Sequence, residues 1–211
     1  MVKKRAYRRR TGAGSTEQHG RPRPRIITGT ARGRRLFVPR GNPETRPILD
    51  RIKTAVFNIL GPGFPYISVL DLFAGAGSLG LEAASRGAAL VVMVETDPSA
   101  VQALRRNASE TRLEDAVEIV RRDAFSFLAS DARTYDLVFL DPPFSWSQAD
   151  RIRPLVSAAL QRLAVGGCIV LRIPAVAAFS DDGLVMDRRR YGASAVLFIS
   201  RKPQENARVE T

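Results

Sequence analysis

Two short motifs in this sequence carry residues that could do chemistry. One is Asp141-Pro142-Pro143-Phe144, which directly follows an apolar run. Its two successive prolines remove two backbone N–H donors and stiffen the turn. What remains is an acceptor-rich edge, formed by the Asp141 carboxylate and the Pro142 carbonyl, with an aromatic ring beside it. Such an edge suits a planar group with two N–H donors, for example the exocyclic amine of a nucleobase or a side-chain amide.

An amine of this kind is a poor nucleophile because its lone pair is delocalised. If acceptors hold both N–H bonds, the lone pair can turn toward a methyl donor, and fixed dipoles stabilise the charge that develops on nitrogen. Asp141, with an ordinary pKa near ~3.9, is too weak a base to deprotonate the neutral amine, so it is expected to orient the amine and take a proton after transfer. Phe144 is expected to stack on an unstacked base, or else to belong to a rigid turn in the core. Trp146 either walls the same pocket or covers the next helix.

The other motif is a glycine-rich turn, Gly75-x-Gly77-x-x-Gly80, which follows Asp71 and opens a helical pattern. The first two glycines are expected at positive φ, where the backbone approaches a ligand closely. Because the spacing also fits dinucleotide sites, the turn alone does not choose between cofactors. Asp71 favours S-adenosylmethionine, since a carboxylate repels a pyrophosphate but attracts the ammonium and sulfonium groups of that cofactor. A nicotinamide oxidoreductase is the alternative.

Two further carboxylates follow the next apolar runs. Glu95 comes 24 positions after Asp71, close to the ~20 expected of a βαβ unit, and is expected to accept ribose hydroxyls. Asp123 is expected to accept the adenine amine, while the Ala124 amide donates to the ring. The structural alternatives are strand-end caps for Asp71 and Glu95 and a helix N-cap for Asp123.

The elements that must position these residues alternate regularly between strands and helices. Predicted strands cover 67–73, 89–94, 117–120, 135–140 and 168–172, and predicted helices cover 78–86, 99–111, 124–129 and 148–163. Repeating βα units predict an α/β fold, a doubly wound Rossmann-like sheet that is mostly parallel. The runs 184–191 and 195–200 predict an antiparallel C-terminal hairpin.

A strongly basic region precedes this body. The 211 residues carry a net charge of +12, and 16 Lys or Arg stand against three acidic residues through Leu60. This asymmetry predicts a polyanionic partner that is bound by the N-terminal part. The predicted organisation is a disordered basic tail over 1–24, an RNA-binding hairpin (strands 26–27 and 36–38) and helix over 25–63, an S-adenosylmethionine-dependent methyltransferase domain over 64–202, and a frayed end over 203–211.

Composition excludes several classes of site. The chain has one cysteine, Cys168, and one histidine, His19, so an internal disulfide or a cysteine metal cluster is impossible and a histidine triad or zinc site is not expected. No apolar run approaches the ~20 residues of a membrane span, and the basic start lacks the apolar core of a secretion signal. We expect a cytoplasmic monomer without metal.

Together these residues resemble the RsmD-type bacterial 16S ribosomal RNA guanine-N2 methyltransferases, within the class I S-adenosylmethionine-dependent enzymes. The resemblance covers about residues 25–201. It rests on the following segments: Gly29-Thr30-Ala31-Arg32-Gly33-Arg34-Arg35-Leu36, Arg46-Pro47 with Asp50-Arg51, Phe57-Asn58, residues 71–83, Glu95-Thr96-Asp97 and residues 141–144.

The resemblance implies methyl transfer from S-adenosylmethionine to the N2 amine of a specific guanine, in 16S ribosomal RNA or in the small subunit. The implied catalytic residues are Asp141, Pro142, Pro143 and Phe144. The implied cofactor residues are Asp71, Phe73, Ala74, Gly75, Gly77, Glu95, Asp123 and Ala124. The implied RNA-binding residues are Arg32, Arg34, Arg35, Arg46, Arg51 and Lys53.

The sequence departs from the usual pattern of that family in one helix. Ile48-Leu49 stand where Thr or Ser is common after Arg-Pro, and Thr54 stands where Glu is common. These departures put the target nucleotide and the level of activity in question. The alternatives are a methyltransferase for another planar amine, adenine N6 or glutamine, and a non-catalytic RNA-binding assembly factor with the same fold.

Overall fold

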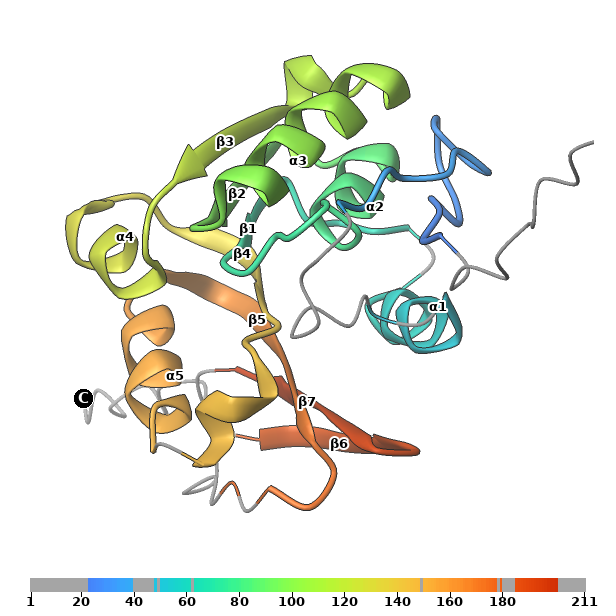
Figure 1. Ribbon diagram of the computed structural model, residues 1–211. Coiled ribbons are helices and arrows are strands. Elements are labelled where there is room, and N and C mark those ends of the chain that lie inside the picture. Colours follow the sequence, from blue (N-terminus) through green and yellow to red (C-terminus); the bar gives the residue numbers. More distant parts are fainter. Residues whose placement is uncertain are drawn as a thin grey trace, which may run out of the picture.

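A twisted sheet runs through the middle of the protein, with helices on both of its faces (Figure 1). The structure is a computed structural model that describes residues 23–39, 48, 50–61, 63–148, 150–177, 179 and 185–200. Within these residues the sheet has seven strands: β1 (Ser68–Asp71), β2 (Leu90–Glu95), β3 (Val117–Arg121), β4 (Tyr135–Leu140), β5 (Leu163–Pro174), β6 (Val185–Tyr191) and β7 (Ser194–Ile199). The helices are α1 (Asp50–Ile59), α2 (Gly80–Ser85), α3 (Pro98–Thr111), α4 (Ala124–Ser130) and α5 (Ile152–Leu160), with short 3-10 turns η1 (Glu114–Ala116) and η2 (Phe144–Gln148).

The strand order is β3-β2-β1-β4-β5-β7-β6. Strands β1 to β5 pair in parallel, while β7 is antiparallel to both β5 and β6. This arrangement confirms the predicted doubly wound fold with an antiparallel C-terminal hairpin. The chain moves outward from β1 to β3 and then crosses to β4, so the direction of winding changes between β1 and β4. A ligand crevice is expected at the carboxyl ends of the strands at such a point.

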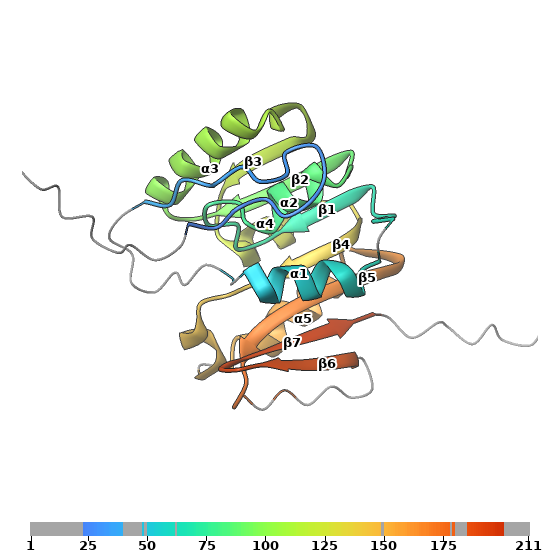
Figure 2. The ribbon, with the colours of Figure 1, turned by 90° about the vertical axis from the view of Figure 1, so that its right-hand side faces the viewer.

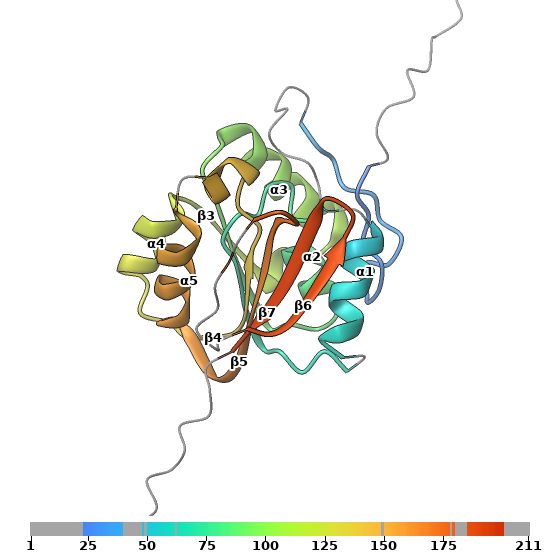
Figure 3. The same ribbon diagram turned by 90° about the horizontal axis from the view of Figure 1, so that it is seen from below.

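Two apolar layers hold the helices to the sheet. Helices α1, α2 and α3 lie on one face and α4 and α5 on the other, which Figure 3 shows along the sheet. Neighbouring residues of β1 serve both layers, because Val69 packs toward the first set of helices and Leu70 toward the second. Strands that are buried on both faces need apolar residues at every position, which explains the continuous apolar runs in the sequence.

The N-terminal segment 23–39 lies along α2 and α3 (Figure 2). The predicted hairpin is a turn with a single bridge, Arg25 to Arg35, rather than two strands. Backbone bonds still cross the turn, from the Ile26 amide to the Arg34 carbonyl and from the Leu36 amide to the Pro24 carbonyl. Between them, Glu82 of α2 accepts from the amides of Ile27 and Thr28 at 2.6 and 3.0 Å. This buried carboxylate is thus one of the groups that hold the segment to the body.

The predicted helix over 148–163 is wrong at both ends. A 3-10 turn occupies Phe144–Gln148, α5 begins only at Ile152, and β5 already starts at Leu163. Asp150 has a φ of 48°, a left-handed conformation that interrupts a helix. Residues 1–22 of the predicted disordered tail (1–24) and all of the predicted frayed end (203–211) lie outside the described residues, as do residues 201–202, Arg46 and Leu49. Pro24 is described, and its carbonyl accepts from the Leu36 amide at 2.8 Å.

Candidate active site

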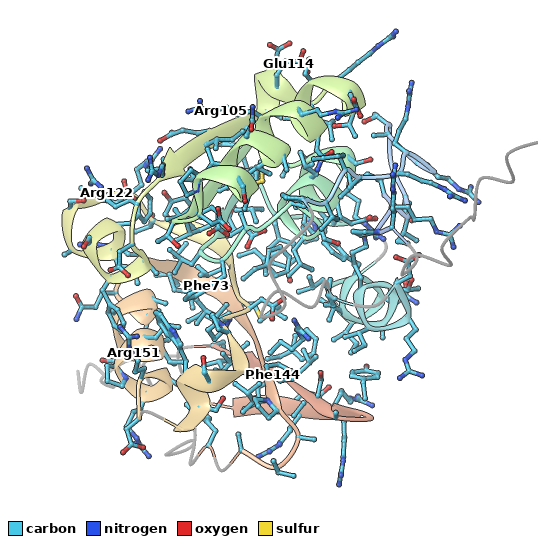
Figure 4. The ribbon with its side chains drawn as sticks, in the orientation of Figure 1. Phe73, Arg105, Glu114, Arg122, Phe144 and Arg151 are labelled. Atoms are coloured by element: carbon cyan, nitrogen blue, oxygen red, sulfur yellow. The ribbon has the colours of Figure 1, made fainter. Side chains whose placement is uncertain are left out.

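A cavity of about 690 Å³ lies at the carboxyl ends of β1, β2, β3, β4 and β5. This volume is typical of small-molecule sites. Its wall includes Phe73 after β1, Arg122 after β3, Phe144 after β4 and Arg151 before α5, all of which Figure 4 labels. Pro24, Val38, Pro39 and Ile48 add an edge from the N-terminal region. The structure thus gathers the carboxylates predicted at separate strand ends into one cavity.

The glycine-rich turn closes around Asp71. Gly75 and Gly77 have φ values of 53° and 89°, which confirms the positive φ predicted for both. The Gly80 amide donates to Asp71 Oδ2 at 2.9 Å, so the carboxylate also holds the first residue of α2. Side chains at 75 and 77 would be strained in this conformation, which explains the choice of glycine.

One carboxylate oxygen of Asp71 is buried without a hydrogen-bond donor among the described residues. The residue is 1% exposed, and its Oδ1 has no hydrogen-bond partner among the described residues. Burial, with a smaller contribution from the negative charge of Asp141, raises the pKa of Asp71 from 3.8 to about 7, although the backbone amides of Gly80 and Phe73 oppose this shift. A buried acceptor without a donor is costly. An ammonium or sulfonium cation in the cavity satisfies this oxygen, so the site fits the methionine end of S-adenosylmethionine and disfavours a pyrophosphate.

Glu95 braces the glycine-rich turn. Its Oε2 accepts from the Gly75 amide at 2.8 Å, and its Oε1 accepts from the amides of Thr96 and Asp97 at 2.7 and 2.9 Å. These bonds confirm the strand-end cap that was the structural alternative for Glu95, and they link the turn after β1 to the end of β2. Each carboxylate oxygen has two lone pairs, and Glu95 Oε2 uses one of them for the Gly75 amide. The other can accept a ribose hydroxyl, and this contact stays a prediction.

Asp123 caps α4. Its Oδ1 accepts from the amides of Phe125 and Ser126 at 3.0 and 3.1 Å, which confirms the N-cap alternative. The residue also lines the cavity together with Ala124. Its proposed contact with adenine is therefore compatible with the cap and stays a prediction.

Asp141 has a partner that sequence analysis missed. Arg172 donates from Nε to Oδ1 at 2.6 Å and from Nη2 to Oδ2 at 2.9 Å, and the two side chains are 12% and 13% exposed. Burial raises the pKa of Asp141, while the Arg172 guanidinium opposes this shift. The predicted acceptor role of the Asp141 carboxylate toward a substrate amine therefore has to share both oxygens with Arg172, since each already accepts one bond. The sequence feature that could have indicated this ion pair is the position of Arg172 at the end of the predicted strand 168–172.

Aromatic rings form the wall beside this pair. Trp146 meets Phe73 edge-on at 5.2 Å and stacks on Phe125 at 6.0 Å, and the Arg151 guanidinium lies 4.0 Å from the Trp146 ring centroid. The Arg172 guanidinium lies 5.2 Å from the Phe144 ring centroid. Trp146 thus walls the cavity, and Phe144 faces it instead of the core.

Most of the arginines predicted to bind RNA are exposed. Arg32, Arg34 and Arg35 lie on the turn that contacts Ser85, the last residue of α2, where the Ala31 amide donates to Ser85 Oγ at 3.0 Å. Arg51 is exposed at the start of α1, with its guanidinium beside Gly192 in the turn between β6 and β7. That turn follows the carboxyl end of β5, since Pro174 pairs with Ser194. Arg51 therefore lies toward the end of the sheet that carries the cavity, whereas the three turn arginines lie beside the last residue of α2.

Lys53 is not available for RNA, so that prediction is wrong. The side chain is fully buried, donates to the Arg25 and Ser78 carbonyls and lies 3.4 Å from Glu82 Oε2. Burial lowers the pKa of Lys53, and the nearby Glu82 carboxylate opposes that change. Lys53 joins α1 to α2 and to the N-terminal segment; its position four residues before Phe57 on the buried helix face was the sequence signal.

The described part of the chain holds no group of three or more His, Cys, Asp or Glu residues that could bind a metal ion. Likewise, no helix among the residues given above is long and apolar enough to cross a membrane.

Comparison with known proteins identifies relatives over most of this chain. The family described as Conserved hypothetical protein 95 matches residues 24–200. Ribosomal RNA small subunit methyltransferase D of Escherichia coli is 43% identical over 120 residues, which are 57% of this chain and 60% of that protein, so the aligned part spans less than two thirds of the relative. YlbH of Bacillus subtilis is 33% identical over 184 residues, which are 84% of this chain and 99% of YlbH. The solved structure of a hypothetical protein from Thermus thermophilus has a TM-score of 0.73 at 32% identity, covering 84% of this chain and 99% of that one.

Proposed function

This chain belongs to the Conserved hypothetical protein 95 family, the RsmD family of class I methyltransferases, and from that premise we propose that it methylates the N2 amine of one guanine in small-subunit ribosomal RNA. The methyl donor is S-adenosylmethionine, and the RNA is either free or part of the small subunit in the cytoplasm. The name of the Escherichia coli relative supports the RNA class. The guanine N2 target rests on the chemistry of the Asp141 edge and on the resemblance of the motifs.

The single observation that carries this proposal is the unpartnered Oδ1 of Asp71 in the same cavity as Asp141. Asp71 binds the cationic methionine end of the cofactor. Glu95 holds the ribose, and Asp123 with the Ala124 amide holds the adenine. The cofactor, when bound, supplies an electrophilic methyl group; the residues of this chain supply orientation and charge.

The Asp141 edge prepares the nucleophile. The Asp141 carboxylate and the Pro142 carbonyl accept the two N–H bonds of the guanine amine, which directs the nitrogen lone pair toward the methyl group. Nitrogen gains the methyl group, and the proton it then loses passes to Asp141 or to water. Burial raises the pKa of Asp141 and makes it a better proton acceptor than an exposed aspartate. Phe144 stacks on the guanine, which has to be looped or flipped out of a helix.

Exposed arginines bind the RNA backbone on one side of the cavity. Arg51 contacts phosphates near the flipped nucleotide, and the turn that carries Arg32, Arg34 and Arg35 contacts phosphates further along the strand. Phosphate contacts position the RNA without reading its sequence. The choice of nucleotide therefore depends on the shape of the RNA and on the cavity.

The test is methyl transfer from radiolabelled S-adenosylmethionine to small subunits from a strain that lacks this gene, followed by nuclease digestion and mass spectrometry. We expect N2-methylguanosine at one position. Asp141→Asn should reduce turnover about 100-fold or more while cofactor binding persists. Asp115→Asn, an exposed aspartate in η1, is the matched control and should leave turnover unchanged.

Other outcomes identify the alternatives. Label in N6-methyladenosine or in a protein glutamine would replace guanine with another planar amine. RNA binding without any transfer by the wild type would indicate a non-catalytic assembly factor. Full turnover by Asp141→Asn would remove the mechanism.

A further inference from the structure

Arg172 forms the innermost ion pair of the cavity. Leu140 pairs with Leu171 in the parallel ladder, so Asp141 and Arg172 leave adjacent strands at the same level. The guanidinium binds both carboxylate oxygens, at 2.6 and 2.9 Å. A two-point contact of this kind fixes the direction of the carboxylate as well as its position.

We propose that Arg172 is a positioning residue for methyl transfer, which holds the Asp141 carboxylate in the one orientation that presents its remaining lone pairs to the substrate amine. This inference rests on the proposed function and extends it to a residue outside the Asp-Pro-Pro-Phe motif.

The lone pairs make the arrangement possible. Each carboxylate oxygen accepts up to two hydrogen bonds, and Arg172 takes one on each. A second acceptor position therefore stays on both oxygens, and rotation of the carboxylate about its Cβ–Cγ bond is blocked. An amine N–H that approaches from the cavity meets an acceptor already in place.

Arg172 is itself held firmly. Its backbone lies between two strands, because β5 pairs with β4 on one side and with β7 on the other, where Arg172 faces Val196. Its guanidinium also packs near the Phe144 ring. The position of Arg172 in the sheet therefore sets the orientation of the Asp141 carboxylate, and the loop that carries Asp141 does not.

Charge supports the same role. Arg172 from β5 opposes the rise in the pKa of Asp141, and the Asp141 charge in turn raises the pKa of Asp71 on β1. Without the guanidinium, the Asp141 carboxylate would be buried with no cation beside it, and its pKa would rise. Arg172 therefore keeps Asp141 able to accept N–H bonds at neutral pH.

A purely structural latch predicts a different behaviour. If Arg172 only joined β4 to β5, its loss would lower the melting temperature and leave the pH profile of the surviving enzyme unchanged. If Arg172 acts through Asp141, its loss changes kcat and the pH at which kcat declines. The pH profile of kcat at saturating cofactor and RNA separates the two, because it reports groups in the complex.

The experiment compares the wild type with Arg172→Ala and Arg172→Lys in the methylation assay from pH 5.5 to 9. For Arg172→Ala we expect kcat at pH 7 to fall about 100-fold, the scale of a misplaced catalytic group. The acid limb should move up by about one to three pH units, and the KM for S-adenosylmethionine should stay the same. Arg172→Lys keeps the charge but loses the two-point contact, so its acid limb should stay in place while kcat falls about tenfold.

The matched control is Arg133→Ala. Arg133 also holds a carboxylate at two points, Glu118 at 2.6 and 3.3 Å, but it precedes β4 at the opposite end of the sheet. Its loss should leave kcat and the acid limb unchanged.

Three results would overturn the inference: an unshifted acid limb in Arg172→Ala, wild-type kcat in Arg172→Lys, or the same changes in Arg133→Ala. If Arg172→Ala does not fold, the Arg172→Lys measurement decides by itself. A wild type that transfers no methyl group to RNA would instead refute the proposed function.

Discussion

Cofactor affinity should depend on pH through Asp71. Burial places the pKa of Asp71 at about 7 in the free protein, and the cationic end of the cofactor binds only the ionised carboxylate. With that pKa, the ionised fraction rises from about 3% at pH 5.5 to about 76% at pH 7.5, and apparent affinity scales with the competent fraction. Ionisation of Asp71 alone should therefore increase affinity about 25-fold between these two values. Both lie below the ~7.7 midpoint of an α-amino group, so more than half of that group still carries its proton at the upper value.

The assay uses the single tryptophan of the chain. Trp146 lies in the cavity wall, against Phe73 and Phe125, so its fluorescence should report occupancy. Titration with S-adenosylhomocysteine, which keeps the ammonium and the adenosine, measures affinity without turnover. Asp71→Asn retains an acceptor for the Gly80 amide but has no charge to titrate; its affinity should be weak and flat over the same range.

Two results would refute this reasoning. Flat affinity in the wild type would mean that Asp71 is already ionised at pH 5.5, and an unchanged slope in Asp71→Asn would assign the effect to another group. Stability gives an independent check of sign. Because the folded-state pKa of Asp71 lies above its unfolded value of 3.8, this group lowers the stability of the free protein as pH rises from about 4 to 7, by on the order of 4 kcal/mol. The cofactor should restore that stability.

Two further predictions concern the N-terminal part. Glu82→Ala leaves the fully buried Lys53 without its carboxylate and should lower the free energy of unfolding, measured in urea, by about 3–5 kcal/mol. The control Glu110→Ala removes an exposed ion pair and should change that free energy by less than about 1 kcal/mol. Equal effects of the two substitutions would contradict the structural role of Glu82. Arg51→Ala should weaken RNA binding and reduce the slope of log affinity against log salt by about 1, while Arg105→Ala on exposed α3, drawn away from Phe144 in Figure 4, should leave it unchanged. An unaltered slope in Arg51→Ala would remove that phosphate contact.

The βα alternation was predictable because the central strands β1, β2 and β4 are continuous apolar runs and the longer helices have one apolar face, although the edge strand β3 is only partly buried. Those two periods are local properties of the sequence. Once the order of elements is known, parallel pairing brings all the carboxyl ends to one edge, so Asp71, Glu95, Asp123 and Asp141 had to meet there. The convergence of these four residues therefore needed no knowledge of side-chain contacts.

The partners of these residues were not predictable in the same way. Arg172 and Asp141 are 31 positions apart, and only the register of β4 against β5 brings them together. Lys53 and Glu82 meet because α1 crosses the N-terminal segment and packs beside α2, an arrangement that no local pattern encodes. A cluster of basic residues indicates RNA binding for the cluster as a whole. Composition cannot show that one member of it, Lys53, is buried in an ion pair instead.

The ion pairs of Glu82 with Lys53 and of Asp141 with Arg172 differ in how many carboxylate lone pairs are used within the protein. This difference distinguishes a structural carboxylate from one that can bind a ligand. Glu82 accepts from Ile27 and Thr28, from Arg86 at 3.0 Å, and lies 3.4 Å from Lys53, so its two oxygens are used within the protein. Asp71 is buried as deeply as Glu82 and Asp141 is 13% exposed, yet Arg172 donates one bond to each Asp141 oxygen, and Asp71 Oδ1 receives none among the described residues. Burying such incompletely used carboxylates costs stability unless a donor completes them. The cavity is therefore expected to bind a cation at Asp71 and an N–H donor at Asp141, which are the two groups that methyl transfer to an amine brings together.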